Sequence, residues 1–461
     1  MSTQRKLYGI LALTAVLGLA TAIVTATSLT FAGGSDRPAS RAPSATPQVC
    51  GTLDGLGCAP ESARVDLFEP AFSDPTNVTN PLFPISDLHS AVLLGRVDGL
   101  PFRTETTLLP ETKVIKWNGK DVETLVSQYV AYLDGRIHEV ALDYYAQADD
   151  GSVWYFGEDV FNYEDGEVAD TDGTWLAGVD GPAAMIMPSN PQVGDAYRPE
   201  NAPGIVFEEV TVTAIGLTVN GPRGPVAGAI TVNELHMDGT REDKIFAPGY
   251  GEFSTGNPGG DLEAIALAVP TDALPGPAPA ELDTLQSGAD DVFGAAEAED
   301  WNTASAALSS MTPAWTAYQA GGVPPMLDTQ MSDAIDALAA AIVARDSAKT
   351  RGAAIHVARA VFDFQLRHQP VVEIDLARFE LWARQTLVDA GEEDATAVKG
   401  DSDTLEWIAD RFDHTLERAD AMSLEKTLAA LERAARKTNF DTAAEAAEGL
   451  LDLLAELEPA S

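Results

Sequence analysis

One acidic and aromatic segment contains the residue types best suited to binding chemistry. Between Asp143 and Asp172 the chain has ten acidic residues and no basic one, interleaved with tyrosine, tryptophan and phenylalanine. Such oxygen-rich clusters can hold calcium, a hard cation that takes about six to eight oxygen ligands. The candidate ligands are Asp149, Asp150, Asp170 and Asp172. The alternative is that these aspartates are solvated turn residues, which the sequence favours because no complete EF-hand loop is present.

The aromatic residues of the same segment predict either a sheet core or a ligand-binding surface. Large rings are typical of β-sheet cores, where each buries about 150–250 Å². If the sheet curls into a half-barrel, the expected ligand site is a hydrophobic cup lined by Trp154, Phe156 and Trp175.

The two cysteines of the chain, Cys50 and Cys58, bracket a glycine-rich stretch, CGTLDGLGC. In an oxidising compartment this spacing predicts one small disulfide. It is not a CxxC motif, so neither a redox site nor a four-cysteine zinc site is expected.

Motifs for nucleophilic or phosphate chemistry are missing from the sequence. There is no GxSxG, HExxH, GxxxxGK[ST] or GxGxxG in a suitable context. The histidines of the C-terminal region also lack the three- or four-residue spacing that metal ligation on a helix needs. We therefore predict no catalytic residue, although a site assembled from distant positions is possible in principle.

The net charge of −42 sets limits on the partners of the chain. Such a surface repels the phosphates of nucleic acids and anionic lipid heads, which excludes both as partners. It suits high solubility, divalent cations or basic partners.

Residues 7–35 carry no charge and follow Arg5 and Lys6, which is typical of an export signal. Residues 1–34 are expected to be either a cleaved signal peptide or an N-terminal membrane anchor. The run is long enough to span a bilayer, and a small-residue cleavage site could also lie at residues 30–32. In both cases the rest of the chain is extracytoplasmic, and only this segment meets the membrane.

Composition divides the remainder of the chain into four parts. Residues 35–64 form a Ser- and Pro-rich linker that ends with the two cysteines. Short runs of β-formers between Asp-Gly and Asn-Gly turns predict an antiparallel β-meander over residues 65–270, curled as a sandwich or half-barrel. Residues 271–292 read as a second linker, and residues 293–458 as an all-α domain.

The helical region contains an internal repeat. Asp300, Asp346, Asp394 and Asp441 each precede an alanine-rich segment, at intervals of 46, 48 and 47 residues. Apolar residues three and four apart follow the anchors, which predicts about seven antiparallel helices in a bundle or short α-solenoid of helical hairpins.

Five segments of the β-region resemble an uncharacterised family of exported bacterial β-domains. They are NPLFPI (residues 80–85), DYYAQADDGSVWYFGEDVFNYEDGEV (143–168), WLAGVDG (175–181), IMPSNPQVGDAYRPENAPG (186–204) and KIFAPGYGEF (244–253). The segment after NPLFPI departs from the family pattern. The resemblance implies secretion and an all-β fold, and because no activity is assigned to that family it implies no catalytic residue.

The expected function is therefore non-enzymatic: extracytoplasmic binding or scaffolding at the cell envelope, with a small apolar ligand or an envelope protein as partner. No cofactor is expected apart from the calcium considered above. The alternatives are an envelope protein that handles calcium or a transition metal, and a secreted hydrolase with a dispersed site.

Overall fold

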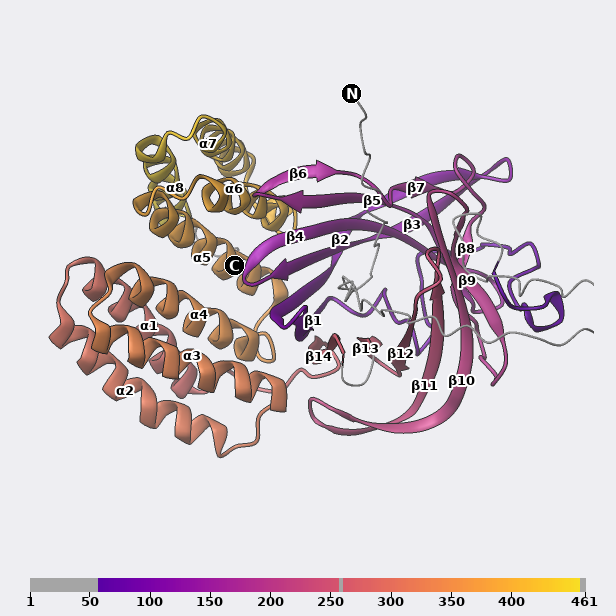
Figure 1. The fold of residues 1–461 in the computed structure, drawn as a ribbon, viewed down its shortest axis with the longest axis horizontal. Helices are drawn as coiled ribbons and strands as arrows, with labels where there is room; N and C mark the ends of the chain where they lie inside the picture. Colours follow the sequence, from indigo (N-terminus) through magenta and orange to yellow (C-terminus); the bar gives the residue numbers. More distant parts are fainter. Residues whose placement is uncertain (1–56, 257–259, 457–461) are drawn as a thin grey trace, which may run out of the picture.

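The computed structural model describes residues 57–256 and 260–456, in which an antiparallel sheet is followed by helices (Figure 1). This order confirms the expected fold class. The leader at residues 1–34 and Cys50 lie outside the described residues. Among the helices that are described, none combines the length and apolarity needed to cross a membrane.

The described strands form one sheet of 14 strands in the order β6-β5-β4-β3-β2-β1-β14-β13-β12-β11-β10-β9, with β7 and β8 paired to β5. All pairings between these strands are antiparallel. The strands are β1 (Ser90–Val97), β2 (Leu100–Trp117), β3 (Lys120–Leu133), β4 (Arg136–Gln147), β5 (Val153–Glu164), β6 (Glu167–Asp170), β7 (Trp175–Leu176), β8 (Ala184–Met187), β9 (Ala196–Ala202), β10 (Val206–Gly221), β11 (Gly224–His236), β12 (Arg241–Ala247), β13 (Gly251–Gly256) and β14 (Leu262–Val269).

The sheet curls into a half-barrel, and β8 contacts β9 as well as its partner β5 (Figure 1). Because side chains alternate along a strand, the curl gives every strand a concave and a convex set. On β1, for example, Ala91 and Leu93 line an interior cavity, whereas Val92 packs against helices. The concave face therefore lines the cavity, and the convex face packs against the helices.

The chain that precedes β1 packs across one end of the half-barrel. Phe72 lies 5.3 Å from Phe156, and Phe83 lies 5.0 Å from Tyr145, measured between ring centroids. The side-chain amide of Asn80 is buried and donates to the carbonyl oxygens of residues 151 and 188. The NPLFPI motif thus fastens this segment to the sheet and places an aromatic ring inside it.

The described helices form four consecutive hairpins. They are α1 (Ala280–Glu297), α2 (Trp301–Gln319), α3 (Pro325–Ala344), α4 (Ser347–Gln365), α5 (Val371–Gly391), α6 (Ala395–Ala409), α7 (Arg418–Arg436) and α8 (Phe440–Glu456). About seven helices were expected, and the additional one is α1, which begins inside the expected linker at residues 271–292. Its stripe of Leu282, Leu285, Ala289 and Val292 is buried, so this segment has an apolar face to pack.

The repeat anchors are the residues that begin the second helix of a hairpin. The side chains of Asp300, Asp346 and Asp394 each accept a hydrogen bond from the backbone three residues on, at 3.1, 3.1 and 3.0 Å. Such N-caps satisfy backbone donors that the helix leaves open. In the fourth hairpin Asn439 makes this bond, and Asp441 lies within α8.

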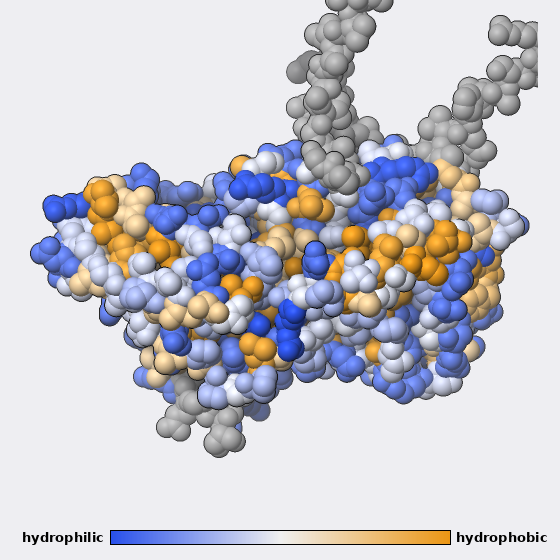
Figure 2. Space-filling view, turned by 90° about the horizontal axis from the view of Figure 1, so that it is seen from below, coloured by the Kyte–Doolittle hydropathy of each residue, from blue (hydrophilic) through white to orange (hydrophobic). Residues whose placement is uncertain are grey.

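The helices cover the convex face of the sheet from β14 to β5. Val92 and Leu267 belong to the apolar core that contains α1–α4, and Val130, Tyr132 and Val140 belong to the core that contains α5–α8. Figure 2 shows polar and apolar residues interspersed over one face of the molecule, with hydrophobic patches on both the sheet half and the helical half.

A buried network of charges connects the convex face to the helices. Arg103 on β2 donates from both terminal nitrogens to the carboxylate of Asp363 on α4, at 2.8 Å each, and its Nε donates to Glu105 at 2.9 Å. Arg378 on α5 also donates to Asp363, at 3.1 Å. Because paired oxygens receive paired donors, this junction has a defined geometry as well as a balanced charge.

Arg411, which follows α6, extends this network. Its Nη1 lies 2.8 Å from Glu105 and 3.4 Å from Asp375, and its Nε donates to Gln128 on β3 at 2.6 Å. Burial raises the pKa values of Glu105 and Asp363, but the arginines outweigh it and hold both below their usual range. These carboxylates therefore stay ionised beneath the helices.

Replacing Arg411 with methionine is expected to destabilise the protein by about 3 to 5 kcal/mol, because two buried carboxylates lose a cation. The free energy of unfolding in urea measures the change. Arg384→Met is the control. Its partners Asp290 and Glu380 are part-exposed, so the loss there should stay below about 1 kcal/mol. Equal losses in the two variants would contradict the special role of the buried network.

Candidate functional site

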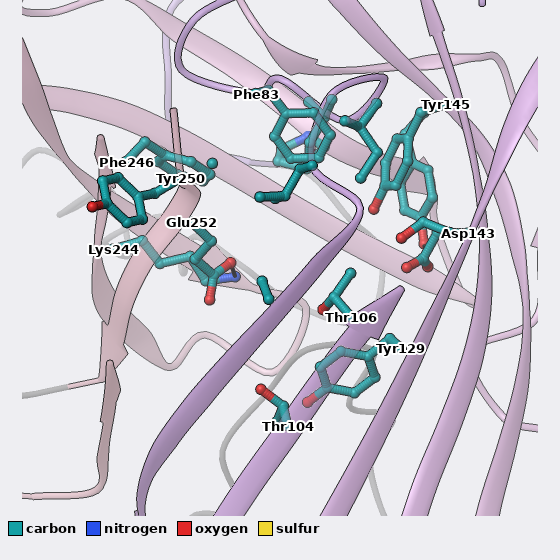
Figure 3. Close-up of a pocket in the computed structure, with 18 of the residues that line it drawn as sticks. Phe83, Thr104, Thr106, Tyr129, Asp143, Tyr145, Lys244, Phe246, Tyr250 and Glu252 are labelled. Carbon is teal, nitrogen blue, oxygen red and sulfur yellow. Dashed lines mark hydrogen bonds and ion pairs between the residues drawn. The ribbon is translucent and has the colours of Figure 1, made fainter. Parts of the chain in front are cut away.

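The concave face of the half-barrel surrounds a cavity of about 110 Å³ (Figure 3). Figure 3 shows Asp143 and Tyr145 on one side of it, Lys244 and Glu252 on the opposite side, and Phe83 between them at one end. The wall is made by inward-facing residues of almost every long strand and by the segment before β1.

Among the described residues, seven carboxyl groups line this cavity. Lys244 is the one basic residue in the same lining. Six of the carboxyl residues are buried, and Glu252 is part-exposed. Burying a charge is costly unless a partner neutralises it, so this excess of acids needs protons or a bound cation. The seven are Asp143, Glu158, Glu200, Glu208, Glu234, Glu252 and Glu263.

The sheet register places like charges directly opposite one another. Asp143 on β4 is paired with Glu158 on β5, and Glu200 on β9 is paired with Glu208 on β10. Opposed like charges destabilise a sheet when both are ionised. The side chains of Glu158 and Glu200 also hydrogen-bond across the gap between β5 and β9, which requires a proton on at least one of them.

An irregularity in β5 turns Glu158 inward. The register of β4 and β5 shifts between the pairs Asp143–Glu158 and Tyr145–Tyr155, so Tyr155 and Glu158 both line the cavity. Gly157 makes this possible, since its φ is +124° and a Cβ there would come within 2.2 Å of the Trp175 carbonyl oxygen. Bulges of this kind re-aim side chains beside functional sites.

Burial raises the pKa of every carboxyl group in the wall. The pKa is raised to about 7 for Asp143 and Glu252 and to about 8 for Glu234 and Glu263. Neighbouring carboxylates add to the effect of burial at Glu234 and Glu263. These groups therefore exchange protons near neutral pH, where a cationic ligand competes with the protons.

Lys244 neutralises part of the acidic wall. Its Nζ lies 2.7 Å from Glu234, 3.6 Å from Glu242 and 3.9 Å from Glu252. Burial lowers the pKa of the ammonium group, but the surrounding carboxylates outweigh it and hold that pKa well above its usual value. Lys244 thus remains charged, and among residues 57–256 and 260–456 no other basic side chain lines the cavity on the Asp143 side.

Aromatic rings make the wall on the Asp143 side. Tyr145 and Tyr155 are stacked with centroids 4.8 Å apart, and Phe83 meets Tyr145 edge-on. The hydroxyl of Tyr155 donates to Asp143 at 2.5 Å. Carboxyl groups and aromatic rings together in one wall are an arrangement that suits organic cations.

The expected aromatic cup does not line this cavity. Trp154 and Phe156 alternate with Tyr155 on β5 and are buried against Phe68, Phe72 and other rings of the apolar core. Trp175 packs edge-on against Tyr155, 5.5 Å away. Trp154 also borders a separate surface hollow near residues 64–70. Ligand binding at these three residues stays a prediction.

The aspartates proposed for calcium make local hydrogen bonds. Asp149 accepts from the backbone and hydroxyl of Ser73, and Asp150 accepts from those of Ser152. Asp170 accepts from Asn162 and from the backbone of Asp172. These contacts suit turn residues, and calcium binding there stays a prediction.

The expected disulfide involves Cys50, which lies outside the described residues. The backbone nitrogen of Cys58 donates to Glu209 at 2.5 Å.

Sequence reasoning missed most of the cavity wall but did single out the segments that contain it. NPLFPI supplies Phe83, the 143–168 segment supplies Asp143 and Glu158, and KIFAPGYGEF supplies Lys244 and Glu252. Glutamates within strand-forming runs, as in FEEV and NELH, were the available signal for part of the remainder. Whether such residues face inward depends on the register and curl of the sheet.

Comparisons of the chain with protein-family models, with curated proteins and with solved structures find no match. The resemblance of the β-region to a family of exported domains therefore stays a prediction.

The stability of the ligand-free protein should fall as the pH rises from about 5 to 8.5. The cavity carboxyls hold protons more tightly in the folded chain than in the unfolded one, so their contribution is complete below the unfolded pKa values of 4.5 for Glu and 3.8 for Asp. It is lost as the pH passes the folded values of about 7 to 8. Melting temperatures across this pH range measure the effect. A melting temperature that rises steadily to pH 8.5 would contradict it.

Glu263→Gln is expected to stabilise the ligand-free protein by about 1 to 3 kcal/mol at pH 8.5 and to have little effect at pH 5, since glutamine cannot ionise in the cavity. One carboxyl oxygen of Glu263 has no hydrogen-bond partner within the described residues, so little is lost on substitution. Urea unfolding at both pH values tests this, with the exposed Glu445→Gln as control. Stabilisation of equal size at pH 5 would argue against an ionisation effect.

Proposed function

We propose that the chain is a non-enzymatic, extracytoplasmic binding protein whose half-barrel binds a small organic cation with an ammonium group. The observation that supports this most is the meeting of unneutralised carboxyl groups and aromatic rings in one interior cavity. The leader expected at residues 1–34 supports a location outside the cytoplasm.

The ammonium group would lie between Asp143, Glu158 and the rings of Tyr145, Tyr155 and Phe83. Carboxylates supply charge, and the ring faces attract a cation that has lost its water. An expected apolar ligand would suit the rings but would leave the carboxylates unneutralised. A ligand that is both cationic and partly apolar satisfies both parts of the wall.

The size of the cavity restricts the ligand. An interior cavity of about 150 Å³ holds a benzene molecule, and the present one is about 110 Å³. A cavity of this size takes the ammonium head of a small amine or quaternary ammonium ion, and because it is partly open to solvent the remainder of the ligand can extend out of it. The buried charge network between the sheet and the helices, together with the segment before β1, would hold the walls of this cavity in place when no ligand is bound.

Choline and its neutral isostere 3,3-dimethylbutan-1-ol test this proposal, because they differ in charge but hardly in shape. Calorimetric titration at pH 8 should show choline binding at least about tenfold more tightly, a difference of 1.4 kcal/mol. Asp143→Asn should remove most of the choline affinity. Asp159→Asn is the matched control, since Asp159 is a neighbour of Glu158 outside the cavity wall and bonds to Tyr144. Equal binding of the neutral isostere, or no binding of choline or other small ammonium ions, would contradict the proposal.

A further inference from the structure

A second set of potential ligand atoms lies on the Lys244 side of the cavity. Glu208, Glu234 and His236 are all buried, and each offers one atom within 4.8 Å of the others. Among the described residues, this is the one group of three or more His, Cys, Asp or Glu side chains placed closely enough to hold a metal ion. His236 is directly opposite Glu208 in the register of β10 and β11, and Glu234 shares a face of β11 with His236. The sheet itself therefore holds the three side chains together.

The separation of these atoms suits one metal ion. The Nδ1 of His236 lies 3.4 Å from Oε1 of Glu208. Two ligands bound tetrahedrally at about 2.0–2.1 Å from zinc are roughly 3.3–3.4 Å apart. The other ring nitrogen of His236 lies 3.7 Å from Glu242, directly opposite Glu234 on β12. A carboxylate at that second nitrogen is a common support for a metal-bound histidine.

Lys244 orients Glu234 without neutralising the whole group. Its Nζ lies 2.7 Å from Oε2 of Glu234, and the Glu234 side chain also hydrogen-bonds to Glu208, which needs a proton that a metal ion would replace. When ionised, Glu208, Glu234, Glu242 and Glu252 carry four negative charges against this one ammonium. A divalent ion would compensate most of the remaining charge.

Tyr197 gives an independent indication of a bound group. It is fully buried in the cavity wall, and its hydroxyl has no hydrogen-bond partner in residues 57–256 or 260–456. It is paired with Val210, which is paired in turn with Glu234, so the three lie in one row across β9, β10 and β11. A buried hydroxyl left without a partner is unfavourable, and a metal-bound water or ligand would supply the missing partner.

We propose that Glu208, Glu234 and His236 bind one divalent transition-metal ion in the half-barrel. An imidazole with two carboxylates favours ions such as zinc or cobalt over calcium and magnesium, which prefer oxygen ligands alone. This site goes beyond the ammonium site and does not depend on it, because the two use different residues. The sequence predicted metal handling as an alternative function. This proposal gives it to Glu208, Glu234 and His236 and not to the aspartates that were expected to bind calcium.

Cobalt(II) titration of the purified, untagged chain at pH 7.5 is the test, since bound cobalt gives visible d–d absorption. We expect one ion per chain, displaced by zinc and not by a large excess of calcium or magnesium. His236→Gln should weaken binding more than about tenfold and alter the absorption bands. His414→Gln, at an exposed histidine outside the cavity, is the control and should bind as the unaltered chain does.

Several results would overturn the metal site: no cobalt band at stoichiometric metal, unaltered binding by His236→Gln, or loss of binding by His414→Gln. Glu234→Gln provides a second variant that keeps the shape of the side chain, and it too should weaken binding. Choline titration of His236→Gln separates the two proposals. Choline binding that survives in this variant while cobalt binding fails in the unaltered chain would refute the metal site alone, and the reverse result would refute the ammonium site alone.

Discussion

Burying a carboxyl group is unfavourable unless a cation or a proton neutralises it, and the two faces of this sheet meet that constraint differently. On the convex face, Glu105 pairs with Arg103 and Arg411. The helices supply further arginines and carboxylates whose charges cancel. On the concave face, seven carboxyl groups share Lys244 within the described residues. The first arrangement fastens the helices to the sheet, whereas the second leaves a site whose charge is incomplete.

That contrast connects stability with binding. Raised carboxyl pKa values mean that the empty cavity is stabilised by protons, and a bound cation would take their place as the pH rises. The helices contribute from the outside, since the apolar cores around Val92 and Tyr132 hold the central strands whose opposite faces line the cavity. The half-barrel and the helices therefore share apolar cores.

Local irregularities complete the site. Gly157 allows the bulge that turns Glu158 inward, and the segment before β1 brings Phe83 to the cavity. NPLFPI, residues 143–168 and KIFAPGYGEF all supply residues to the cavity wall. The side chain of Asn80 in NPLFPI also bonds to the carbonyl oxygens of residues 151 and 188, which holds the segment before β1 in place.

The sequence by itself determined the order of sheet and helices, because turn dipeptides and two-residue alternation mark hairpins and three- to four-residue periodicity marks helices. It also determined the helical repeat, since the aspartates that cap α2, α4 and α6 are local signals. Only the tertiary structure decided which acids gather in one cavity. Asp149 lies in a turn and Asp170 ends β6, whereas Asp143 and Glu158 meet inside the half-barrel with carboxyl groups from β9–β14 that are far away in the chain. Strand register, bulges and the curl of the sheet decide which side chains converge, and these depend on long-range pairing rather than on neighbouring residues.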